Sequence, residues 1–523
     1  PDNMVRAPVG IDAGGITFVS PRRNNGPVPA FSGDQALINQ YTGWGPTGEV
    51  KFTRMAAKAR NVKDFKAALQ YFDVGSQNWI YGDVDGNIGY FTSAEIPLRA
   101  DLAQGTVDGM VPPWIIRDGT GALNHEWLPV SNPQPGQAIP FEVLPYEEMP
   151  QIVNPPWGYI ANANNDPVGT TLDNNPLNQL RPGGNGIYYL NPGYSDFRQG
   201  RVDRVLAELV ESGVPVTVQN MMDLQANAEL LDAELTLPTL LAQFDGMELP
   251  PESPMAQALD VLSTWDYSSP TGLAEGWDPG DDPMMAVEPD EMERRNAAAA
   301  TVFAMWRSQL VRNTIDATLT AVGLGDYLPG SKTAHRAFAH HLLNYETNGG
   351  FGASGLNFFS QGLAPTVQAS LQQALDLLAS DEFAPAFANS TDVMDYAWGK
   401  LHRIVFNHPL NADPFNIPNG GGFMDLAPEL PGLARQGGFE AVDASSHSAR
   451  ADSLNGFMFG SGPSRRFVGE MTPDGVVGYQ AIAGGQSGVF LSPNYSSQLP
   501  LWLTNSYHDL ALGEEDGAAA AVS

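Results

Sequence analysis

The sequence predicts an α+β fold because three kinds of pattern follow one another along the chain. Short apolar or alternating runs, separated by turn residues, occur in the first 200 residues and are typical of strands. Residues 201–398 instead repeat apolar side chains at spacings of three and four, which is typical of helices. From residue 399 the pattern of short runs between Gly and Pro returns. We therefore expect sheets whose strands come from both ends of the chain.

This pattern divides the chain into four segments. We expect a first β-rich part with an active-site loop at 1–200, a mainly helical part at 201–398, and a returning β-rich part at 399–512. The remaining residues, 513–523, include EEDGAAAAVS and are expected to form a disordered tail.

The clearest local element is a hairpin near residue 85. NWIYGD (78–83) and NIGYFTS (87–93) are rich in β-formers and flank Asp85-Gly86, a dipeptide favoured where both turn residues need positive φ. Strands are also predicted within 14–43, and a helix is predicted from Asp64. Residues 96–150 are rich in Pro and Gly and indicate a long excursion over the surface.

Three helices are predicted in the central segment. The first covers 201–212, the second is capped by Thr217 and runs without a break to about residue 244, and the third covers 297–323. We assign their Met, Trp and Phe side chains to the core, because helical spacing of such residues is typical of packing. After residue 398 the β-like runs are GGFEAVDA, GFMFG, RRFVGEM, GVVGYQAI and GVFLSP.

Composition excludes several classes of partner and of chemistry. The 523 residues include 59 acidic and 27 basic side chains, and the formal charge of −32 would repel nucleic acid and anionic lipid. There is no cysteine, which removes disulfides, thiolate nucleophiles and Cys-based zinc sites. No apolar run is long enough to span a membrane, and the N-terminus lacks the pattern of a signal peptide. If the protein is exported, we expect this to be a processed form.

Residues 154–204 form the stretch around which the rest of the chain is organised. Gly, Pro and Asn at this density cannot form a regular element, and the apolar residues among them argue against disorder. Asn164 offers a side-chain N–H that could stabilise an oxyanion, a contribution of roughly 3 kcal/mol in other enzymes. Arg198 could hold a carboxylate or fix the loop that bears Asn164. On residue type alone, a turn-forming Asn and a surface Arg remain the alternatives.

The usual signatures of several large enzyme classes are absent from the sequence. There is no G-x-S-x-G elbow, HExxH motif, P-loop, or GxGxxG that opens a helix. His340 and His341 are adjacent, so on a helix they face different directions and make a poor metal pair. His402, His408 and His447 are scattered without ligand spacing, and we assign them structural roles.

Several stretches taken together resemble the penicillin acylase family of N-terminal-nucleophile hydrolases. They follow the family's order along nearly the whole chain, and as a set they are specific. The stretches are NWIYGDVDGNIGYFTSAEIPLR (78–99), NPPWGYIANANNDP (154–167), FRQGRVDRVLAEL (197–209), DLQANAELLDAELTLPTLL (223–241), ALDVLSTWD (258–266), WGKLHRIVFNHPL (398–410), and 437–502 from GGFEAVDAS to GGQSGVFLSPNYSSQLPLW.

The resemblance implies a four-layer αββα core and a secreted, periplasmic or cell-envelope enzyme cut from a precursor into α and β chains. The nucleophile would be the serine at the start of the β chain, with its own α-amine as base and an acyl-enzyme as intermediate. The family's oxyanion asparagine falls on Asn164, through GYIANANN, and its active-site arginine falls on Arg198, through FRQGRVDR. Some members bind a structural calcium, for which Asp173 is the nearest candidate here; a turn aspartate is the alternative. No other cofactor is implied.

One departure from the family concerns the front of the chain. It begins at Pro1, and the family's opening serine segment with its following strands is not present. We expect that segment and an α chain of the same precursor to be the partners. Two hypotheses follow: an acylase that hydrolyses a linear amide, or a non-catalytic cell-envelope subunit on the same scaffold. For the acylase, β-lactam side-chain amides, acyl-homoserine lactones and lipopeptides are the substrate classes, with a lean towards an apolar acyl chain.

Overall fold

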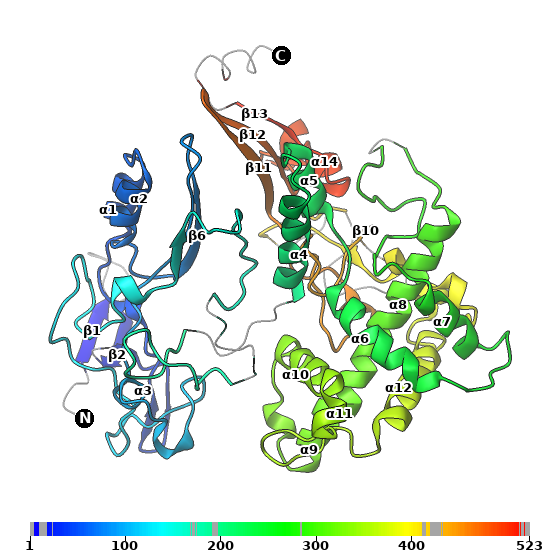
Figure 1. The fold of residues 1–523 in the computed structure, drawn as a ribbon, viewed down its shortest axis with the longest axis horizontal. Helices are drawn as coiled ribbons and strands as arrows, with labels where there is room; N and C mark the ends of the chain where they lie inside the picture. Colours follow the sequence, from blue (N-terminus) through cyan, green and yellow to red (C-terminus); the bar gives the residue numbers. More distant parts are fainter. Residues whose placement is uncertain are drawn as a thin grey trace. The chain divides into compact units, whose positions relative to one another are not determined.

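A computed structural model describes residues 5–9, 18–23, 25–167, 169, 173, 175–190, 197–282, 285–410, 415–418, 430, 432–511, 513 and 517. The chain forms two compact units, unit 1 at Pro1–Tyr194 and unit 2 at Ser195–Ser523 (Figure 1). Each unit is described by itself. Both contain helices and strands, which confirms the predicted α+β class. The finer division into four segments stays a prediction.

Unit 1 is built from short elements joined by long loops. Its strands are β1 (Val5–Val9), β2 (Phe18–Arg23), β3 (Gly26–Pro27), β4 (Ala30–Ser32), β5 (Gln35–Leu37), β6 (Gln77–Gly82), β7 (Ile88–Ser93) and β8 (Gln151–Val153). Its helices are α1 (Glu49–Ala56), α2 (Val62–Leu69) and α3 (Ala100–Ala103), with 3-10 turns η1 (Thr42–Trp44), η2 (Asp108–Met110) and η3 (Tyr146–Glu148). Strands within 14–43 and the helix from Asp64 were therefore predicted correctly in kind.

The predicted hairpin is present as β6 and β7, which pair antiparallel with Gly82 opposite Ile88. Its turn is longer than a two-residue turn, and of Asp85 and Gly86 only Gly86 has positive φ, +85°. The side chain of Asp83 accepts hydrogen bonds from the backbone N–H groups of Asp85 (3.1 Å) and Asn87 (2.9 Å), which fixes this wider turn. Strand β8 joins the other edge of β7 and leads directly into residues 154–167, which we call the asparagine loop.

The core of unit 1 consists of small clusters. One contains Phe52, Ala68, Leu69 and Phe91, with half-buried aromatic side chains around it. Another contains Leu144, Met149 and Tyr188. Residues 96–150 form no long element among the described residues, as predicted, and cross the unit through isolated bridges such as Pro97–Val143.

Unit 2 contains the long helices of the chain. They are α4 (Phe197–Glu211), α5 (Val218–Ala226), α6 (Leu231–Leu241), α7 (Pro254–Ser263), α8 (Glu291–Val311), α9 (Ala317–Ala321), α10 (Ser331–Leu343), α11 (Tyr345–Asn348), α12 (Leu363–Leu378), α13 (Ala384–Phe387) and α14 (Leu499–Leu503). Tighter or wider turns are η4 (Ala242–Phe244), η5 (Arg312–Asp316), η6 (Gly325–Tyr327), η7 (Val393–Asp395), η8 (Trp398–Lys400), η9 (Leu454–Phe457) and η10 (Pro493–Tyr495).

The second predicted helix is wrong in one respect, because it is broken into α5 and α6. Thr217 does cap α5, in a capping box with Asn220. After Ala226, however, the backbone of Asn227 turns extended, and the N–H of Leu230 bonds to the carbonyl of Tyr267 (2.9 Å) instead of continuing the helix. A contact 37 positions away along the sequence therefore decides where this helix ends.

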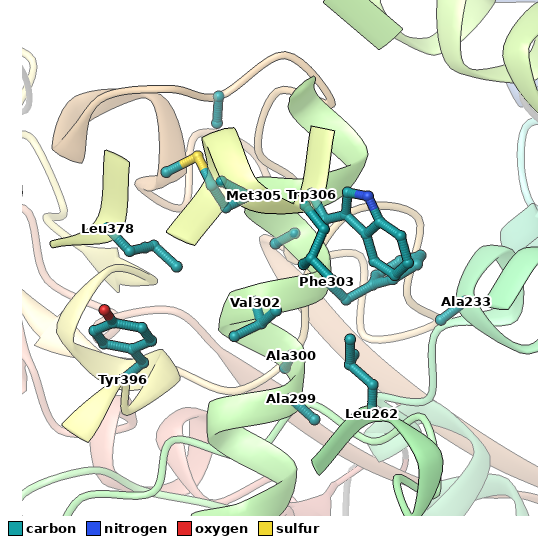
Figure 2. Close-up of a cluster of buried hydrophobic side chains, with 14 of the residues drawn as sticks. Ala233, Leu262, Ala299, Ala300, Val302, Phe303, Met305, Trp306, Leu378 and Tyr396 are labelled. Atoms are coloured by element: carbon teal, nitrogen blue, oxygen red, sulfur yellow. The ribbon is translucent and has the colours of Figure 1, made fainter. Parts of the chain in front are cut away.

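Helix α8 forms the centre of the large core in unit 2. Figure 2 shows Phe303, Met305 and Trp306 on this helix, with side chains of other helices around them. Their exposed fractions are 1%, 0% and 0%. The assignment of these Met, Trp and Phe residues to the core is confirmed.

The closing part of the chain contains fewer strands than predicted. RRFVGEM and GVVGYQAI are strands, β11 (Arg465–Thr472) and β12 (Gly475–Ile482), and β13 (His508–Leu510) completes their sheet. A second pair joins β9 (Arg403–Ile404) to β10 (Leu433–Ala434). GGFEAVDA is not a strand, because Glu440 and Ala444 have positive φ (62° and 58°) and the segment forms successive turns. GFMFG begins within the 3-10 turn η9 and then leaves it, and GVFLSP is also a turn segment.

Among the described helices, none combines the length and the apolar character needed to cross a membrane.

Candidate active site

The asparagine loop starts at a fixed point on the sheet of unit 1. Asn154 follows β8 in the left-handed conformation (φ 50°), and its side-chain oxygen accepts a hydrogen bond from the N–H of Ile88 (3.0 Å). Its side-chain nitrogen donates to the side chain of Asn87 (2.9 Å) in the turn between β6 and β7. The loop is thereby tied to the hairpin before it reaches Asn164.

Within the loop, the asparagines bond to one another. Asn165 accepts hydrogen bonds from the side chain of Asn162 (3.2 Å) and from the N–H of Ala163 (3.1 Å). Asn162 in turn accepts one from the N–H of Asn164 (3.2 Å). These short-range bonds satisfy the backbone without a regular element, as Asn side chains commonly do in turns.

Asn164 is the exposed member of this network and has a φ of 57°. Asparagine enters that region more readily than most residues, so the backbone alone gives one reason for Asn here. Exposure gives a second: the side chain lies at the loop surface, where its N–H group can face a substrate. Two residues further along, Asp166 is buried. The pKa of Tyr90 on β7 is raised by the burial of Tyr90 itself and by the charge of Asp166.

Arg198 lies in the first turn of α4, in unit 2, and is half-buried. Helix α4 is fixed to α6 by Arg201, whose guanidinium pairs with Glu229 (2.8 Å) and with Glu234 (2.6 Å). Gly200 allows close approach, since a Cβ there would lie 2.6 Å from a methyl carbon of Leu231. The helix that carries Arg198 is therefore held firmly within unit 2, whereas Asn164 belongs to unit 1.

Asp173, the sequence-based candidate for a calcium ligand, is exposed. Its carboxylate accepts hydrogen bonds from the N–H of Asn175 (2.9 Å) and from the side chain of Asn178 (2.5 Å). Within the described ranges, no group of three or more His, Asp or Glu side chains is arranged to hold a metal ion. The contacts of Asp173 are those of a turn aspartate, and its role as a ligand stays a prediction.

A buried polar cluster in unit 2 was not visible in the sequence. Arg307 on α8 donates to Asp232 on α6 (2.9 Å) and contacts the ring of His447 (3.3 Å). His335 on α10 lies 3.4 Å from the same carboxylate. Burial lowers the pKa of His335 and His447, so both rings are neutral at pH 7. The cluster joins three helices of the core.

This cluster also reaches the helix that bears Arg198. The ring of Phe197, the first residue of α4, lies 5.1 Å from that of His335. The ring centres of His447 and His402 are 5.8 Å apart, so these two histidines, far apart in the sequence, are neighbours in the fold. No local pattern signals this arrangement, because its members come from elements far apart along the chain.

Unit 1 contains a cavity of about 270 Å³ that the sequence also did not indicate. Two buried carboxyl groups line it, those of Asp73 and Glu95. Burial raises the pKa of Glu95 to about 7, although hydrogen bonds from the N–H groups of Ala138 and Ile139 lower it. Burial likewise raises the pKa of Asp73. Carboxyl groups that titrate near neutrality are frequent at functional sites, although buried structural groups behave in the same way.

Comparison with known proteins gives three findings. The family model described as "Penicillin amidase" matches residues 14–519. Penicillin G acylase of Escherichia coli is 30% identical over 215 residues, which are 40% of this chain and 20% of the relative's length. A solved structure of a thermostable penicillin G acylase from Alcaligenes faecalis superposes with a TM-score of 0.61 at 17% identity, covering 99% of this chain and 80% of that one.

The structural likeness shows the fold, which is that of the Alcaligenes faecalis penicillin G acylase, and confirms the fold class predicted from the sequence. In the alignment with the Escherichia coli enzyme, the chain spans one fifth of the relative's length, 20%. The family model, in contrast, runs through nearly all 523 residues. The chain belongs to the penicillin amidase family.

Proposed function

We propose that this chain is the major part of the β subunit of an acylase that hydrolyses a linear amide. The nucleophile is an N-terminal serine that lies outside residues 1–523, and the α chain of the same precursor is the other partner. The enzyme works outside the cytoplasm, in the periplasm, cell envelope or medium, where a net charge of −32 favours solubility. Membership of the penicillin amidase family supports the reaction class.

The observation that carries the proposal is the exposed position of Asn164 on a loop held by hydrogen bonds. It lies at the surface of a loop that is tied to the β6–β7 hairpin by Asn154 and held internally by Asn162 and Asn165. Such a loop presents an amide donor with little conformational freedom. Preorganised donors of this kind stabilise the charge that develops on a carbonyl oxygen during acyl transfer.

In the proposed reaction the serine hydroxyl attacks the amide carbonyl, and the carbonyl oxygen gains negative charge. The side-chain N–H of Asn164 donates to that oxygen. The α-amine of the serine takes the hydroxyl proton and passes it to the leaving nitrogen as the intermediate collapses. This releases the amine and leaves an ester on the serine, which water then hydrolyses to the free acid. Arg198, fixed by the docking of α4 on α6, supports the geometry of the site. We expect an apolar acyl group on the substrate.

The test uses natively purified protein and two amides, N-phenylacetyl and N-octanoyl homoserine lactone. Released acid is measured by chromatography, and reactions quenched within the first turnover are examined by intact-mass spectrometry and N-terminal sequencing of every polypeptide. We expect a companion polypeptide that begins with serine and carries the acyl mass during turnover. Hydrolysis without an acylated serine would contradict the proposed mechanism.

The same measurement addresses the alternative, a non-catalytic subunit of the cell envelope. That reading predicts no acid release from any amide and no acylated polypeptide, even when every chain of the native assembly is present. The acylase proposal would then be wrong.

A further inference from the structure

Three arginines lie in one part of unit 1, and two of them have carboxylate partners. Arg181 forms a bidentate pair with Glu148, at 2.8 and 2.9 Å. Arg117 pairs in the same way with the buried carboxylate of Asp101. Arg99 has neither an ion pair nor a side-chain hydrogen bond in the part of the chain that the structure describes. In a chain with a net charge of −32, an arginine without a carboxylate is unexpected.

The guanidinium of Arg99 is half-buried and lies over the ring of Tyr189, 5.4 Å from its centre. Burial lowers the pKa of Arg99, and the charge of Arg117 adds to that effect. Tyr189 and the carboxylate of Asp101, which is already paired with Arg117, oppose it without cancelling it. Arginine nevertheless stays protonated in proteins, so the positive charge remains. Partial burial of a cation without an anionic partner is unfavourable, and an anion at this position would relieve it.

Tyr189 supplies a second donor at the same place. Its hydroxyl makes no hydrogen bond to any described residue, and burial raises its pKa, so it remains a neutral phenol at pH 7. Both side chains line a small cavity of about 20 Å³, which has room for one water-sized group. A carboxylate can place one of its oxygens in this space, and it can accept two hydrogen bonds from a guanidinium.

An exposed apolar side chain lies beside Tyr189. The ring of Trp114 lies 6.3 Å from that of Tyr189 and is 44% exposed. The next two residues, Ile115 and Ile116, are also exposed, at 52% and 78%. A cation over Tyr189, with the exposed Trp114 on the same tyrosine, matches a ligand that has an anionic head and an apolar chain.

We propose that Arg99, Tyr189 and Trp114 form a binding site for a small carboxylic acid with an apolar chain. The carboxylate binds to the guanidinium of Arg99 and accepts a hydrogen bond from the hydroxyl of Tyr189. The chain lies against Tyr189 and Trp114. Neither Asn164 nor Arg198 is one of its residues. Hydrolysis of an N-acyl amide releases acids of this chemical class.

The probe is octanoate, titrated into native protein that carries Asn164→Gly, so that binding is measured apart from turnover. Calorimetry gives the affinity, and tryptophan fluorescence, with Trp114→Phe as reference, reports where the ligand binds. We expect saturable binding of octanoate and at least tenfold weaker binding of both 1-octanol and acetate, which lack the charge or the chain. Arg99→Gln should weaken octanoate binding at least tenfold, and Arg99→Lys should weaken it less.

Arg54→Gln is the matched control, because Arg54 is an exposed arginine of α1 in the same unit. It should leave octanoate binding unchanged. Arg99→Gln should not lower the unfolding temperature, since it removes an unpaired charge, and this separates loss of binding from misfolding. Equal octanoate affinity in the wild type and Arg99→Gln, or no saturable binding, would overturn the site while leaving the acylase proposal unaffected.

Discussion

The two units achieve stability in different ways. Unit 2 has one large core, in which α8 is buried along most of its length and an ion pair is enclosed among helices. Unit 1 has several small clusters, and its loops hold their shape through hydrogen bonds such as those of Asn154 and Asp83. The unit with the smaller cores carries the exposed Asn164. If Asn164 has its predicted role, this agrees with the general finding that binding and catalytic residues often lie on loops held by a scaffold.

The largest difference is expected for matched core truncations. Phe303 in unit 2 and Phe91 in unit 1 are both 1% exposed. Phe303→Ala should cost about 3 to 5 kcal/mol of unfolding free energy, because the closely packed helices around it cannot collapse into the cavity. Phe91→Ala should cost about 2 kcal/mol less, since half-buried neighbours can move into the space. Urea unfolding followed by fluorescence measures both. Equal costs would remove the distinction between the two cores.

Buried ion pairs give the next comparison. Asp232→Ala leaves Arg307 as an uncompensated charge in the core of unit 2 and should cost about 3 kcal/mol. Asp101→Ala does the same to Arg117 in unit 1, whose side chain is 9% exposed compared with 1% for Arg307. Water can reach Arg117 more easily, so we expect a smaller loss of unfolding free energy. A larger loss for Asp101→Ala would contradict this explanation.

Two carboxyl groups with raised pKa, one in each unit, predict how stability depends on pH. Burial raises the pKa of Glu95 to about 7, and burial together with the charge of Asp278 raises that of Glu293 to about 7. The folded state favours the protonated form of both carboxyl groups. The contribution of each group to the unfolding free energy is therefore complete below the ordinary glutamate pKa of 4.5, and it is lost as pH rises to about 7. Stability should therefore fall across this range and level off above it.

Glu95→Gln and Glu293→Gln should each reduce the total fall of unfolding free energy over this pH range. The reduction should be on the order of 1 kcal/mol for each unit by which burial raises the pKa of that carboxyl group. Unfolding temperatures measured between pH 4.5 and 8 provide the test. A slope that neither substitution changes would show that other groups cause it.

The smallest effects are expected at helix caps. Thr217 caps α5 in unit 2, and Asn61 caps α2 in unit 1 through a 2.9 Å bond to the N–H of Asp64. Each substitution to Ala should cost about 1 kcal/mol of unfolding free energy, because a cap is a local interaction that does not depend on the size of the core. Clearly different costs would indicate that the units also differ at the level of local structure.

Local features could be read from the sequence. The β6–β7 hairpin, the cap at Thr217 and helices α4 and α8 all follow from short patterns, and the structure contains each of them. The break between α5 and α6 could not be foreseen, because it depends on a hydrogen bond from Leu230 to Tyr267. GGFEAVDA has the composition of a strand, and only the positive φ of Glu440 and Ala444 reveals successive turns.

The candidate site follows the same rule. The asparagine loop is a continuous segment, so its residues and its lack of regular structure could be predicted. Asp232 and Arg307, in contrast, are 75 positions apart in the sequence. The binding role proposed for Arg99 depends on its contact with Tyr189, which in turn lies beside Trp114. Such sites depend on long-range packing, for which a single sequence provides no signal. The roles of Asn164, Arg198 and Asp173 stay predictions.

The measurement that tests the central claim most directly compares Asn164→Gly with Asn389→Gly in the native enzyme. Both asparagines are exposed and have φ near 60°, at 57° and 58°, so glycine fits both backbones without strain. If Asn164 is the oxyanion donor, Asn164→Gly should lower kcat on the order of a hundredfold with little change in KM or in unfolding temperature. Asn389→Gly should leave kcat unchanged. An Asn164→Gly enzyme with the turnover of the wild type would contradict the role assigned to this residue.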